Sequence, residues 1–229
     1  MTETSADHTN ASGLARRVRA AIWVVLAAVV VAGVTWYFVM AGQSQARDVQ
    51  PAAAAQVVRA DSHRLTAPME EKAQLVEFLD FECEACRGAI PLIESLKAEY
   101  GDRITFVHRY YPLAGHRNSV TSALAVEAAA QQGKYQEMAD RLFETQPQWG
   151  ESSESKAQQF RTYAQELGMD LAAYDAAVAS DATRQRVEQD IADGKALGVT
   201  GTPTFFLDGK KLRLDTEAQF RQLLDDAVR

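Results

Sequence analysis

Two cysteines stand two residues apart in the segment Phe81–Cys86, which reads FECEAC, and the 229-residue chain contains no others. A disulfide framework needs several cysteine pairs, and a structural zinc site usually needs four ligands. An isolated Cys-x-x-Cys pair instead suits a dithiol that closes to a disulfide and opens again. Cys83 and Cys86 are therefore the first candidates for chemistry, and that chemistry requires no metal and no cofactor.

The residues around this pair predict a strand before it and a helix after it. Residues Leu75–Leu79 are apolar apart from Glu77 and predict a buried strand. Residues 83–100 place apolar side chains at helical spacing and end at a glycine, and residues 104–107 predict the next strand. Strand, helix and strand in about thirty-five residues form a βαβ unit.

This arrangement gives the two cysteines different roles. Cys83 lies at the N-terminus of the helix, where free N–H groups and the helix dipole stabilise a thiolate and lower its pKa. We expect it to be the exposed thiol that attacks, or is attacked, through a mixed disulfide. Cys86 lies one turn further on the same face and deeper, and is expected to resolve that mixed disulfide. The alternative is a structural pair that never cycles.

The middle of the chain is helical. Its pattern predicts helices over residues 118–133, 134–145 and 153–168, one capped by Asp170, and one from Asp181 to about Leu197.

Strands frame this helical block. Residues Val57–Leu65 predict a first strand, and Asp208-Gly209 predicts a hairpin between residues 204–207 and 211–214. The capping box Thr216–Gln219 opens a last helix that runs to Val228. Without the helical block, the βαβ unit and the hairpin would form a four-stranded sheet with helices on its faces.

This order of elements resembles the thioredoxin fold, and the helical insertion, about residues 115–198, makes the chain similar to the DsbA-like thiol-disulfide oxidoreductases. The resemblance covers residues 62–229. The segment Leu75–Cys86 resembles the family's strand, loop and helix that carry the active site. The segment Tyr111–His116, YPLAGH, resembles the stretch ahead of the inserted helices, and Gly198–Thr204, GVTGTPT, resembles the cis-proline loop.

The resemblance implies an α/β, thioredoxin-like fold and a protein disulfide oxidoreductase with Cys83 and Cys86 as its redox-active pair. It places Glu77 beneath Cys86, where a desolvated carboxyl group has a raised pKa and can exchange a proton with the resolving thiol. The alternative is an outward-facing strand glutamate. It also implies a cis bond before Pro203, opposite the cysteines, with the backbone of Thr202 free to pair with an extended substrate.

Residues that tune the pair depart from the family's pattern. The dipeptide between the cysteines is Glu84-Ala85 and not the Pro-His of the strongest oxidants. We expect Glu82 and Glu84, if close, to raise the pKa of Cys83 by roughly one unit. Its pKa is then expected between about 3.5 and about 7. His116 is a further candidate for tuning or metal binding, although a histidine in this position more often caps or packs.

The segment Ala20–Met40 contains no charged residue and is long enough to cross a bilayer as a helix. Arg16, Arg17 and Arg19 precede it, so the positive-inside rule places the N-terminus in the cytoplasm. The sequence therefore predicts a single-pass cell-membrane protein, in contact with the lipid bilayer, whose catalytic domain is extracytoplasmic. A cleaved signal peptide is the alternative. The predicted parts are a cytoplasmic N-terminus (1–19), a transmembrane helix (20–40), a linker (41–61) and the thioredoxin-like domain (62–229).

The charge of the chain excludes one class of partner. Its net charge is −7, and residues 1–46 hold three arginines and two acidic residues, so the remainder carries −8. Because nucleic-acid affinity depends on clustered cations, an acidic domain of this kind predicts no nucleic-acid binding.

These features predict a membrane-tethered enzyme that exchanges thiols and disulfides in exported, cysteine-containing proteins, with disulfide formation favoured. A membrane redox partner would recycle the cysteine pair. The first alternative is an extracytoplasmic thiol reductase, because direction depends on a potential that the sequence does not encode. The second is a copper-binding, thioredoxin-like chaperone that uses the two thiolates and His116. A non-catalytic interaction domain is a third, which the presence of both cysteines disfavours.

Overall fold

The computed structural model describes residue 33 and residues 55–229, and the chain divides into two units, Met1–Ala53 and Ala54–Arg229. The apolar segment Ala20–Met40, apart from Gly33, and most of the expected linker lie outside the described residues. Among the described residues, no helix has the length and apolar character needed to cross a membrane.

A mixed sheet with the strand order β1-β3-β2-β4-β5 forms the centre of the second unit. The predicted βαβ unit is present as β2 (Ala73–Leu79), α2 (Glu84–Tyr100) and β3 (Ile104–Tyr110), and the two strands pair in parallel. The predicted hairpin forms β4 (Thr204–Leu207) and the short β5 (Lys210–Lys211), with β4 antiparallel to β2. These correspond to the four strands expected from the sequence, but the last one covers only Lys210–Lys211 and not residues 211–214.

The first strand, predicted over Val57–Leu65, is much shorter. Only β1 (His63–Arg64) pairs with β3, as an antiparallel edge strand. The residues ahead of β1 do not pair with a strand. The carbonyl oxygens of Gln56 and Val57 instead accept hydrogen bonds from the Arg109 side chain. That segment therefore packs against the sheet instead of extending it.

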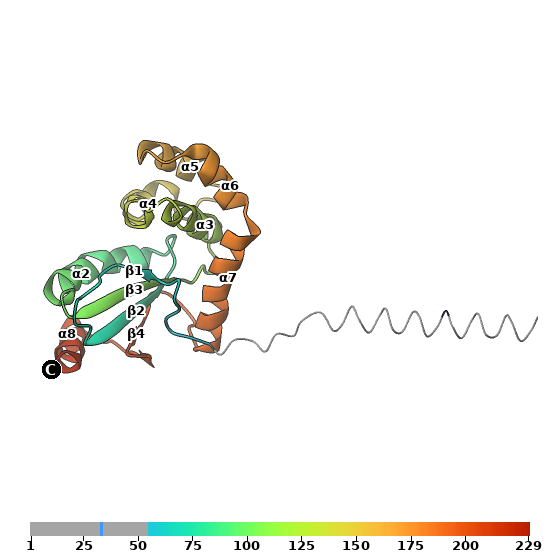
Figure 1. Ribbon diagram of the computed structural model, residues 1–229. Coiled ribbons are helices and arrows are strands. Elements are labelled where there is room, and N and C mark those ends of the chain that lie inside the picture. The colour runs from blue at the N-terminus through green and yellow to red at the C-terminus, as the bar shows by residue number, and fades with distance from the viewer. Residues whose placement is uncertain (1–32, 34–54) are drawn as a thin grey trace, which may run out of the picture. The chain divides into compact units, whose positions relative to one another are not determined.

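Five helices separate β3 from β4, as the sequence predicts. They are α3 (Ser119–Ala130), α4 (Tyr135–Trp149), α5 (Ala157–Glu166), α6 (Leu171–Ala179) and α7 (Asp181–Ala196). A final helix, α8 (Glu217–Ala227), follows the hairpin, and the Thr216 side chain caps it as expected. Asp170 caps α6 as expected, whereas α7 is capped by Ser180 and not by Asp181. Figure 1 shows α3, α4, α5 and α6 gathered beyond the sheet and α7 returning to it.

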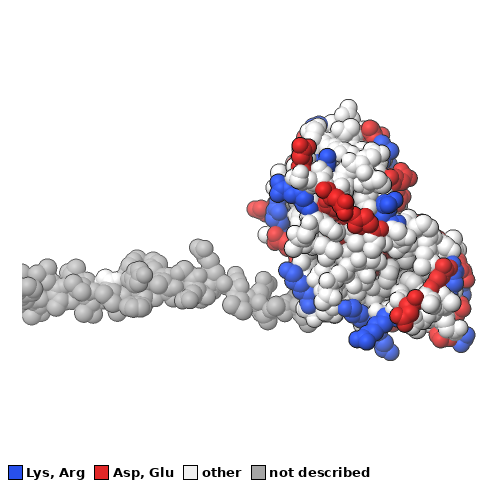
Figure 2. Space-filling model, turned by 180° about the vertical axis from the view of Figure 1, so that it is seen from behind, with Lys and Arg blue, Asp and Glu red and all other residues white. Residues whose placement is uncertain are grey.

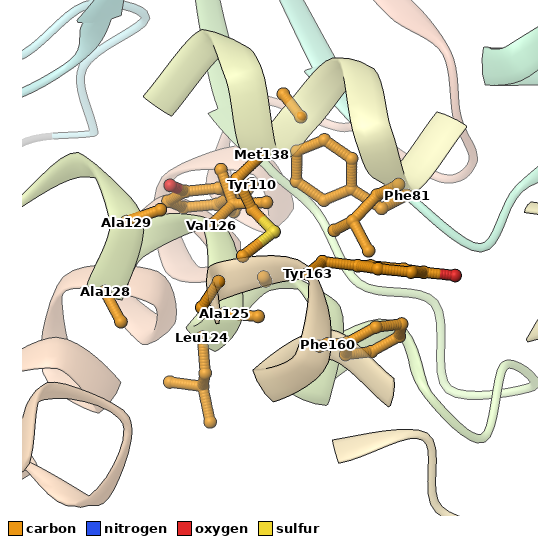
Figure 3. Close-up of a cluster of buried hydrophobic side chains, with 14 of the residues drawn as sticks. Phe81, Tyr110, Leu124, Ala125, Val126, Ala128, Ala129, Met138, Phe160 and Tyr163 are labelled. Atoms are coloured by element: carbon orange, nitrogen blue, oxygen red, sulfur yellow. The ribbon is translucent and has the colours of Figure 1, made fainter. Parts of the chain in front are cut away.

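The helices bury different parts of the sheet. On one face, α2 and α8 cover Leu75, Ile104 and Phe106. The largest cluster lies in the helical insertion, and it extends to the active-site loop and β3 through Phe81 and Tyr110. Figure 3 shows both aromatic side chains among residues of the inserted helices, such as Val126 and Met138. The insertion and the cysteine loop therefore share one core.

Helix α7 holds the opposite face of the sheet through charge and close packing. Arg109 on β3 is fully buried and donates to Asp190 and Asp193 of α7 at 2.6 Å each. Removing one partner from such a buried ion pair is strongly destabilising. Gly194 permits the close approach, because a Cβ there would lie 2.6 Å from the ring of Tyr111.

Candidate active site

The two cysteines lie where the loop after β2 becomes helix α2. Cys83 is the N-cap residue of α2 and Cys86 lies inside its first turn. Both thiols are free. Cys83 is 7% exposed and Cys86 is fully buried, so Cys83 is the more accessible sulfur but is less exposed than expected.

The loop before β4 lies against Cys83. Its Thr202–Pro203 peptide bond is cis, as predicted. The Cys83 thiol donates a 3.4 Å hydrogen bond to the carbonyl oxygen of Thr202. The structure therefore brings Cys83, Thr202 and Pro203 together although about half the chain separates them in sequence.

The surroundings of Cys83 favour its thiolate. Its pKa is lowered to about 5, first because the Cys86 thiol donates a hydrogen bond to the Cys83 sulfur. Burial opposes this, while the side chain of Thr202 and the backbone N–H groups of Cys86 and Ala85 support it. Those two amides belong to the free N-terminus of the helix, as the sequence argument required. The value lies inside the range expected from the sequence.

Cys86 has the opposite character. Burial raises its pKa, and the hydrogen bond to Cys83 and the nearby charge of Glu77 raise it further. Glu77 itself is buried on β2, and burial followed by the charge of Cys83 raises its pKa to about 8. Glu77 therefore faces inward toward the cysteine pair, and the alternative of an outward-facing glutamate is wrong.

Asp80 fixes the loop that leads to Cys83, and sequence reasoning did not single it out. Its Oδ1 accepts from the backbone N–H of Glu82 at 2.9 Å. Its Oδ2 accepts from the backbone N–H of Leu113 at 3.0 Å and pairs with Nδ1 of His116 at 2.6 Å. One buried carboxylate thus joins the cysteine loop to the segment Tyr111–His116, which lies ahead of the inserted helices.

His116 lies at the site because of this pairing. Its side chain is one-quarter exposed. Burial would lower its pKa, but the hydrogen bond and charge of Asp80 raise it overall, and the charges of Glu82 and Cys83 add to the rise. The expectation that His116 lies near the cysteines agrees with this geometry, and the imidazole is held by Asp80.

Glu82 corrects the sequence interpretation. We expected it to be a surface charge or to repel the thiolate, whereas its side chain is buried and directed into the insertion. Its carboxylate accepts from the backbone N–H of Asn118 at 2.6 Å and of Glu151 at 3.1 Å. The charge is satisfied there because Asn118 begins helix α3, where free amides favour an anion. Glu84 and Ala85, in contrast, are exposed.

Gln146 of α4 holds the loop from the other side. Its Nε2 donates to the carbonyl oxygens of Phe81 at 2.8 Å and of Cys83 at 3.0 Å, and its Oε1 accepts from Arg87 at 3.0 Å. No sequence pattern marks this residue, because a glutamine in the middle of an amphipathic helix has no distinctive spacing. The helical insertion therefore contributes directly to the shape of the cysteine loop.

A cavity of about 390 Å³ opens beside His116. Its lining includes Leu113, His116 and Val120 on one side and Thr200, from the loop of the cis-proline, on the other. Within residues 55–229, no three His, Cys, Asp or Glu side chains are grouped so that they could hold a metal ion. The described site is thus a thiol pair, a buried carboxyl group and a loop with an adjoining hollow.

Comparison with known proteins agrees with this geometry. Residues 70–226 match the family described as thioredoxin. The chain belongs to the thioredoxin family. Among solved structures, a thioredoxin-like oxidoreductase from Silicibacter pomeroyi is 25% identical with a TM-score of 0.63, over 76% of this chain and 95% of that one.

Two further solved structures have a similar fold. BdbD from Bacillus subtilis has a TM-score of 0.63 at 17% identity, over 71% of this chain and 91% of its own. Alpha-DsbA1 from Wolbachia pipientis has a TM-score of 0.62 at 16% identity, over 75% and 92%. At these identities the likeness shows the fold: a thioredoxin-like fold with an inserted helical block.

Curated relatives match through a part of their length. The Na(+)/H(+) antiporter NhaA of Herminiimonas arsenicoxydans is 35% identical over 155 residues, which is 68% of this chain and 24% of that protein. An antiporter NhaA 1 from Mycobacterium sp. (strain KMS) is 34% identical over 142 residues, 60% of this chain and 22% of its own length. The chain thus spans about a quarter of the length of these relatives.

Proposed function

We propose that the protein is a thiol-disulfide oxidoreductase that introduces disulfides into exported, cysteine-containing proteins. The observation that carries this proposal is the contrast between its two thiols. The pKa of Cys83 is lowered to about 5, whereas burial raises that of Cys86. In this chemistry a disulfide is oxidising to the extent that the reduced thiolate is stabilised, because a more stable reduced form shifts the equilibrium toward reduction of the disulfide.

The proposed reaction begins with the Cys83–Cys86 disulfide. A substrate thiolate attacks the sulfur of Cys83, the bond between the two cysteines breaks, and Cys86 leaves and takes up a proton. A second substrate thiolate then attacks the substrate sulfur of the mixed disulfide and releases Cys83 as a thiolate. The substrate has lost two electrons and the protein has gained them. A membrane redox partner would then reoxidise the pair.

The backbone at Thr202 and Pro203 is proposed to position the substrate. The carbonyl oxygen of Thr202 lies within hydrogen-bond distance of Cys83. An extended substrate that lay along this loop would therefore present its cysteine to the Cys83 sulfur. The adjoining cavity near Leu113 and His116 supplies room for a neighbouring side chain.

The equilibrium potential of the pair tests the direction of the reaction. The full chain, in detergent, is equilibrated in glutathione buffers of graded composition, and the Cys83–Cys86 disulfide is quantified by mass after alkylation. We expect a potential between about −120 mV and about −270 mV, nearer the oxidising end. A reduced, unfolded test protein should then gain disulfides from the oxidised chain. A potential at or below that of thioredoxin would favour the alternative, an extracytoplasmic reductase.

We also propose that the chain is anchored by its apolar segment. The support is the uncharged stretch Ala20–Met40 and the arginines that precede it. Protease added to cells that have lost the cell wall but keep an intact cell membrane should digest the domain that holds Cys83. Extraction of the chain from the membrane should require detergent. A soluble mature form that begins near Gly42 would instead indicate a cleaved signal peptide.

A copper-binding chaperone remains the candidate of another class, because two thiolates suit Cu(I). Nδ1 of His116 is paired to Asp80, so Nε2 is the nitrogen that would have to bind copper. Titration of the reduced chain with Cu(I) against a competing chelator decides between them. Tight, stoichiometric binding that His116→Ala weakens would support the chaperone, and weak binding that this variant leaves unchanged would support the oxidoreductase.

A further inference from the structure

One row of side chains crosses the sheet from the buried acid to the edge strand. Glu77 on β2 pairs with His108 on β3, and His108 pairs with His63 on β1. Directly paired residues point to the same face of a sheet. The register therefore places a carboxyl group and two imidazoles side by side, on the face that α2 covers and that the insertion reaches. Figure 1 shows β1, β3 and β2 as neighbours in this order.

The inner end of this row is enclosed by apolar groups. A cavity of about 10 Å³, roughly the space of one water molecule, lies beside Glu77 and His108. Apolar side chains form the rest of its lining: Leu65, Leu75, Ile93, Phe106, Val107 and Phe205. The Nε2 atom of His108 lies 3.7 Å from Oε2 of Glu77. His108 is thus the polar neighbour through which a proton on Glu77 can leave this enclosed space.

Tyr135, at the start of α4, continues the row outward. Its hydroxyl group lies 3.1 Å from Nδ1 of His108. Its ring stacks on the ring of His63, with centroids 4.0 Å apart and an interplanar angle of 17°. Tyr135 is partly exposed, whereas Glu77 and His108 are buried. The polar groups therefore run from the buried carboxyl group to the partly exposed residue Tyr135, with a 3.7 Å step between Glu77 and His108 that is longer than a hydrogen bond.

Two further groups fix the stacking partner of Tyr135. Nε2 of His63 lies 2.7 Å from Oε2 of Glu127 on α3, and the Tyr110 hydroxyl donates to the same oxygen at 3.0 Å. The contact with Glu127 fixes the His63 ring, and His63 stacks on the Tyr135 ring from the side of the edge strand β1. Their side chains are 14% and 11% exposed.

We propose that His108 and Tyr135 carry protons between Glu77 and solvent, with His63 and Glu127 as positioning residues. The inference rests on the proposed function, in which Glu77 exchanges a proton with Cys86. It assigns the helical insertion a part in the reaction, because α3 and α4 supply Glu127 and Tyr135.

A neutral imidazole suits this role because one ring nitrogen accepts while the other donates. Burial, followed by the charges of Lys97 and His63, lowers the pKa of His108 to about 3. When Cys86 gives its proton to Glu77, the carboxylic acid passes a proton to Nε2 of His108, for which the 3.7 Å gap between the two side chains has to close to hydrogen-bond distance. Nδ1–H of His108 then donates to the Tyr135 oxygen, and the Tyr135 hydroxyl releases its own proton to solvent. The reverse sequence supplies a proton when Cys86 is the leaving thiolate.

The charged and titratable groups that face this path come from several elements. Around Glu77 they are Cys83, Cys86 and His108. Around His108 they are Lys97 of α2, His63 of β1, Glu77 and Tyr135. Around Tyr135 they are His108 and His63, which contact it, and Glu127, Asp190, Glu77 and Arg186. Any pH dependence measured for the path has to be compared with the titration of these groups.

The variant Tyr135→Phe tests the proposal, since it removes the hydroxyl group and keeps the stacking ring. Tyr100→Phe is the matched control, because its hydroxyl donates to Asp225 at 2.9 Å, away from the path. The reduced full chain is mixed with glutathione disulfide, quenched with acid and analysed by mass. Attack by Cys83 depends on the glutathione disulfide concentration. Closure of the Cys83–Cys86 bond, for which Cys86 must lose its proton, does not.

We expect Tyr135→Phe to slow the closure step on the order of ten-fold, with a larger solvent isotope effect in D₂O. The attack step, the equilibrium potential and the control Tyr100→Phe should stay unchanged. An unchanged closure rate in Tyr135→Phe would overturn the proposed relay. A slower rate that is accompanied by a shifted equilibrium potential or a shifted Cys83 pKa would overturn it as well. A wild-type chain that forms no mixed disulfide would instead overturn the proposed function itself.

Discussion

The Cys83 thiol donates a hydrogen bond to the Thr202 carbonyl oxygen across 3.4 Å, although 119 residues separate the two in sequence. When the thiol loses its proton, this carbonyl no longer has a donor from Cys83. The backbone of an approaching substrate can then use it. The Thr202 carbonyl oxygen therefore marks where a substrate strand would begin.

The first prediction concerns the division of labour between the thiols. Cys83→Ser should abolish thiol exchange, because it removes the sulfur that forms the mixed disulfide. Cys86→Ser should trap mixed disulfides with substrates, because no second thiol resolves them. Non-reducing electrophoresis of cell membranes after acid quenching would show higher-mass, reductant-sensitive adducts for Cys86→Ser. If they accumulate equally with Cys83→Ser, the roles are assigned wrongly.

The second prediction concerns the origin of the low pKa of Cys83. The hydrogen bond from Cys86 is its largest cause, and the pKa is lowered to about 5. Cys86→Ala removes that donor and should raise the pKa of Cys83, whereas Cys86→Ser keeps a hydroxyl donor and should raise it less. The rate of alkylation against pH reports the thiolate directly, since only the thiolate reacts. A pKa in Cys86→Ala equal to that of the wild type would mean that the hydrogen bond from Cys86 does not stabilise the thiolate.

Local features of the sequence predicted the elements that carry the site. The lone Cys-x-x-Cys pair after an apolar strand predicted Cys83 at the start of α2. The Asp208-Gly209 turn predicted the β4–β5 hairpin. These inferences hold because turn chemistry, helix caps and hydrophobic period act over a few residues.

The supporting contacts of the loop were not predictable in this way. Glu82 bonds to amides 36 and 69 residues away, and Gln146 bonds to the loop across 63 and 65 residues. Neither residue type signals burial, because glutamate and glutamine are ordinarily exposed. Likewise, the pairing of Glu77 with His108 depends on the register of two strands, which the sequence pattern alone leaves open.

The third prediction concerns the fit of α7 against the sheet. Gly194→Ala should destabilise the protein by about 1–3 kcal/mol, because the added Cβ would lie 2.6 Å from the Tyr111 ring. Gly88→Ala in α2 is the control, since a Cβ there meets nothing within 4 Å. It should stabilise by about 0.5–1 kcal/mol through helix propensity. Urea unfolding measures the change in the free energy of unfolding for both variants. An unchanged value for Gly194→Ala would show that α7 can shift away from Tyr111 without cost.

The fourth prediction revises the expected effect of Glu84. From their positions in the sequence, Glu82 and Glu84 together are predicted to raise the pKa of Cys83 by roughly one unit. Because Glu84 is exposed and Glu82 is bonded within the insertion, that expectation is too large. Glu84→Gln should lower the pKa of Cys83 by less than about half a unit, an effect that salt screens. Alkylation at low and at high ionic strength measures it, and a salt-independent fall of a full unit would contradict the screened geometry.

The last prediction concerns the pH dependence of stability that Glu77 causes. Its pKa is raised from 4.5 to about 8 in the folded protein, first by burial and then by the charge of Cys83. Between these two values the folded state holds a proton that the unfolded state has lost. Folding stability from this group is therefore fully present below about pH 4.5, and it is lost as the pH rises through about 8.

The background Cys83→Ala/Cys86→Ala isolates this effect, because the thiols titrate in the same range and the charge of Cys83 is removed. In that background the free energy of unfolding should fall by a few kcal/mol, in order of magnitude, between about pH 5 and about pH 8. Adding Glu77→Gln should flatten the curve, since a neutral amide fills the same space. Adding Glu70→Gln, at a side chain that is 84% exposed, should leave the slope unchanged. Parallel curves with and without Glu77→Gln, from urea unfolding at each pH, would show that Glu77 ionises normally and cannot serve as the proton acceptor of Cys86.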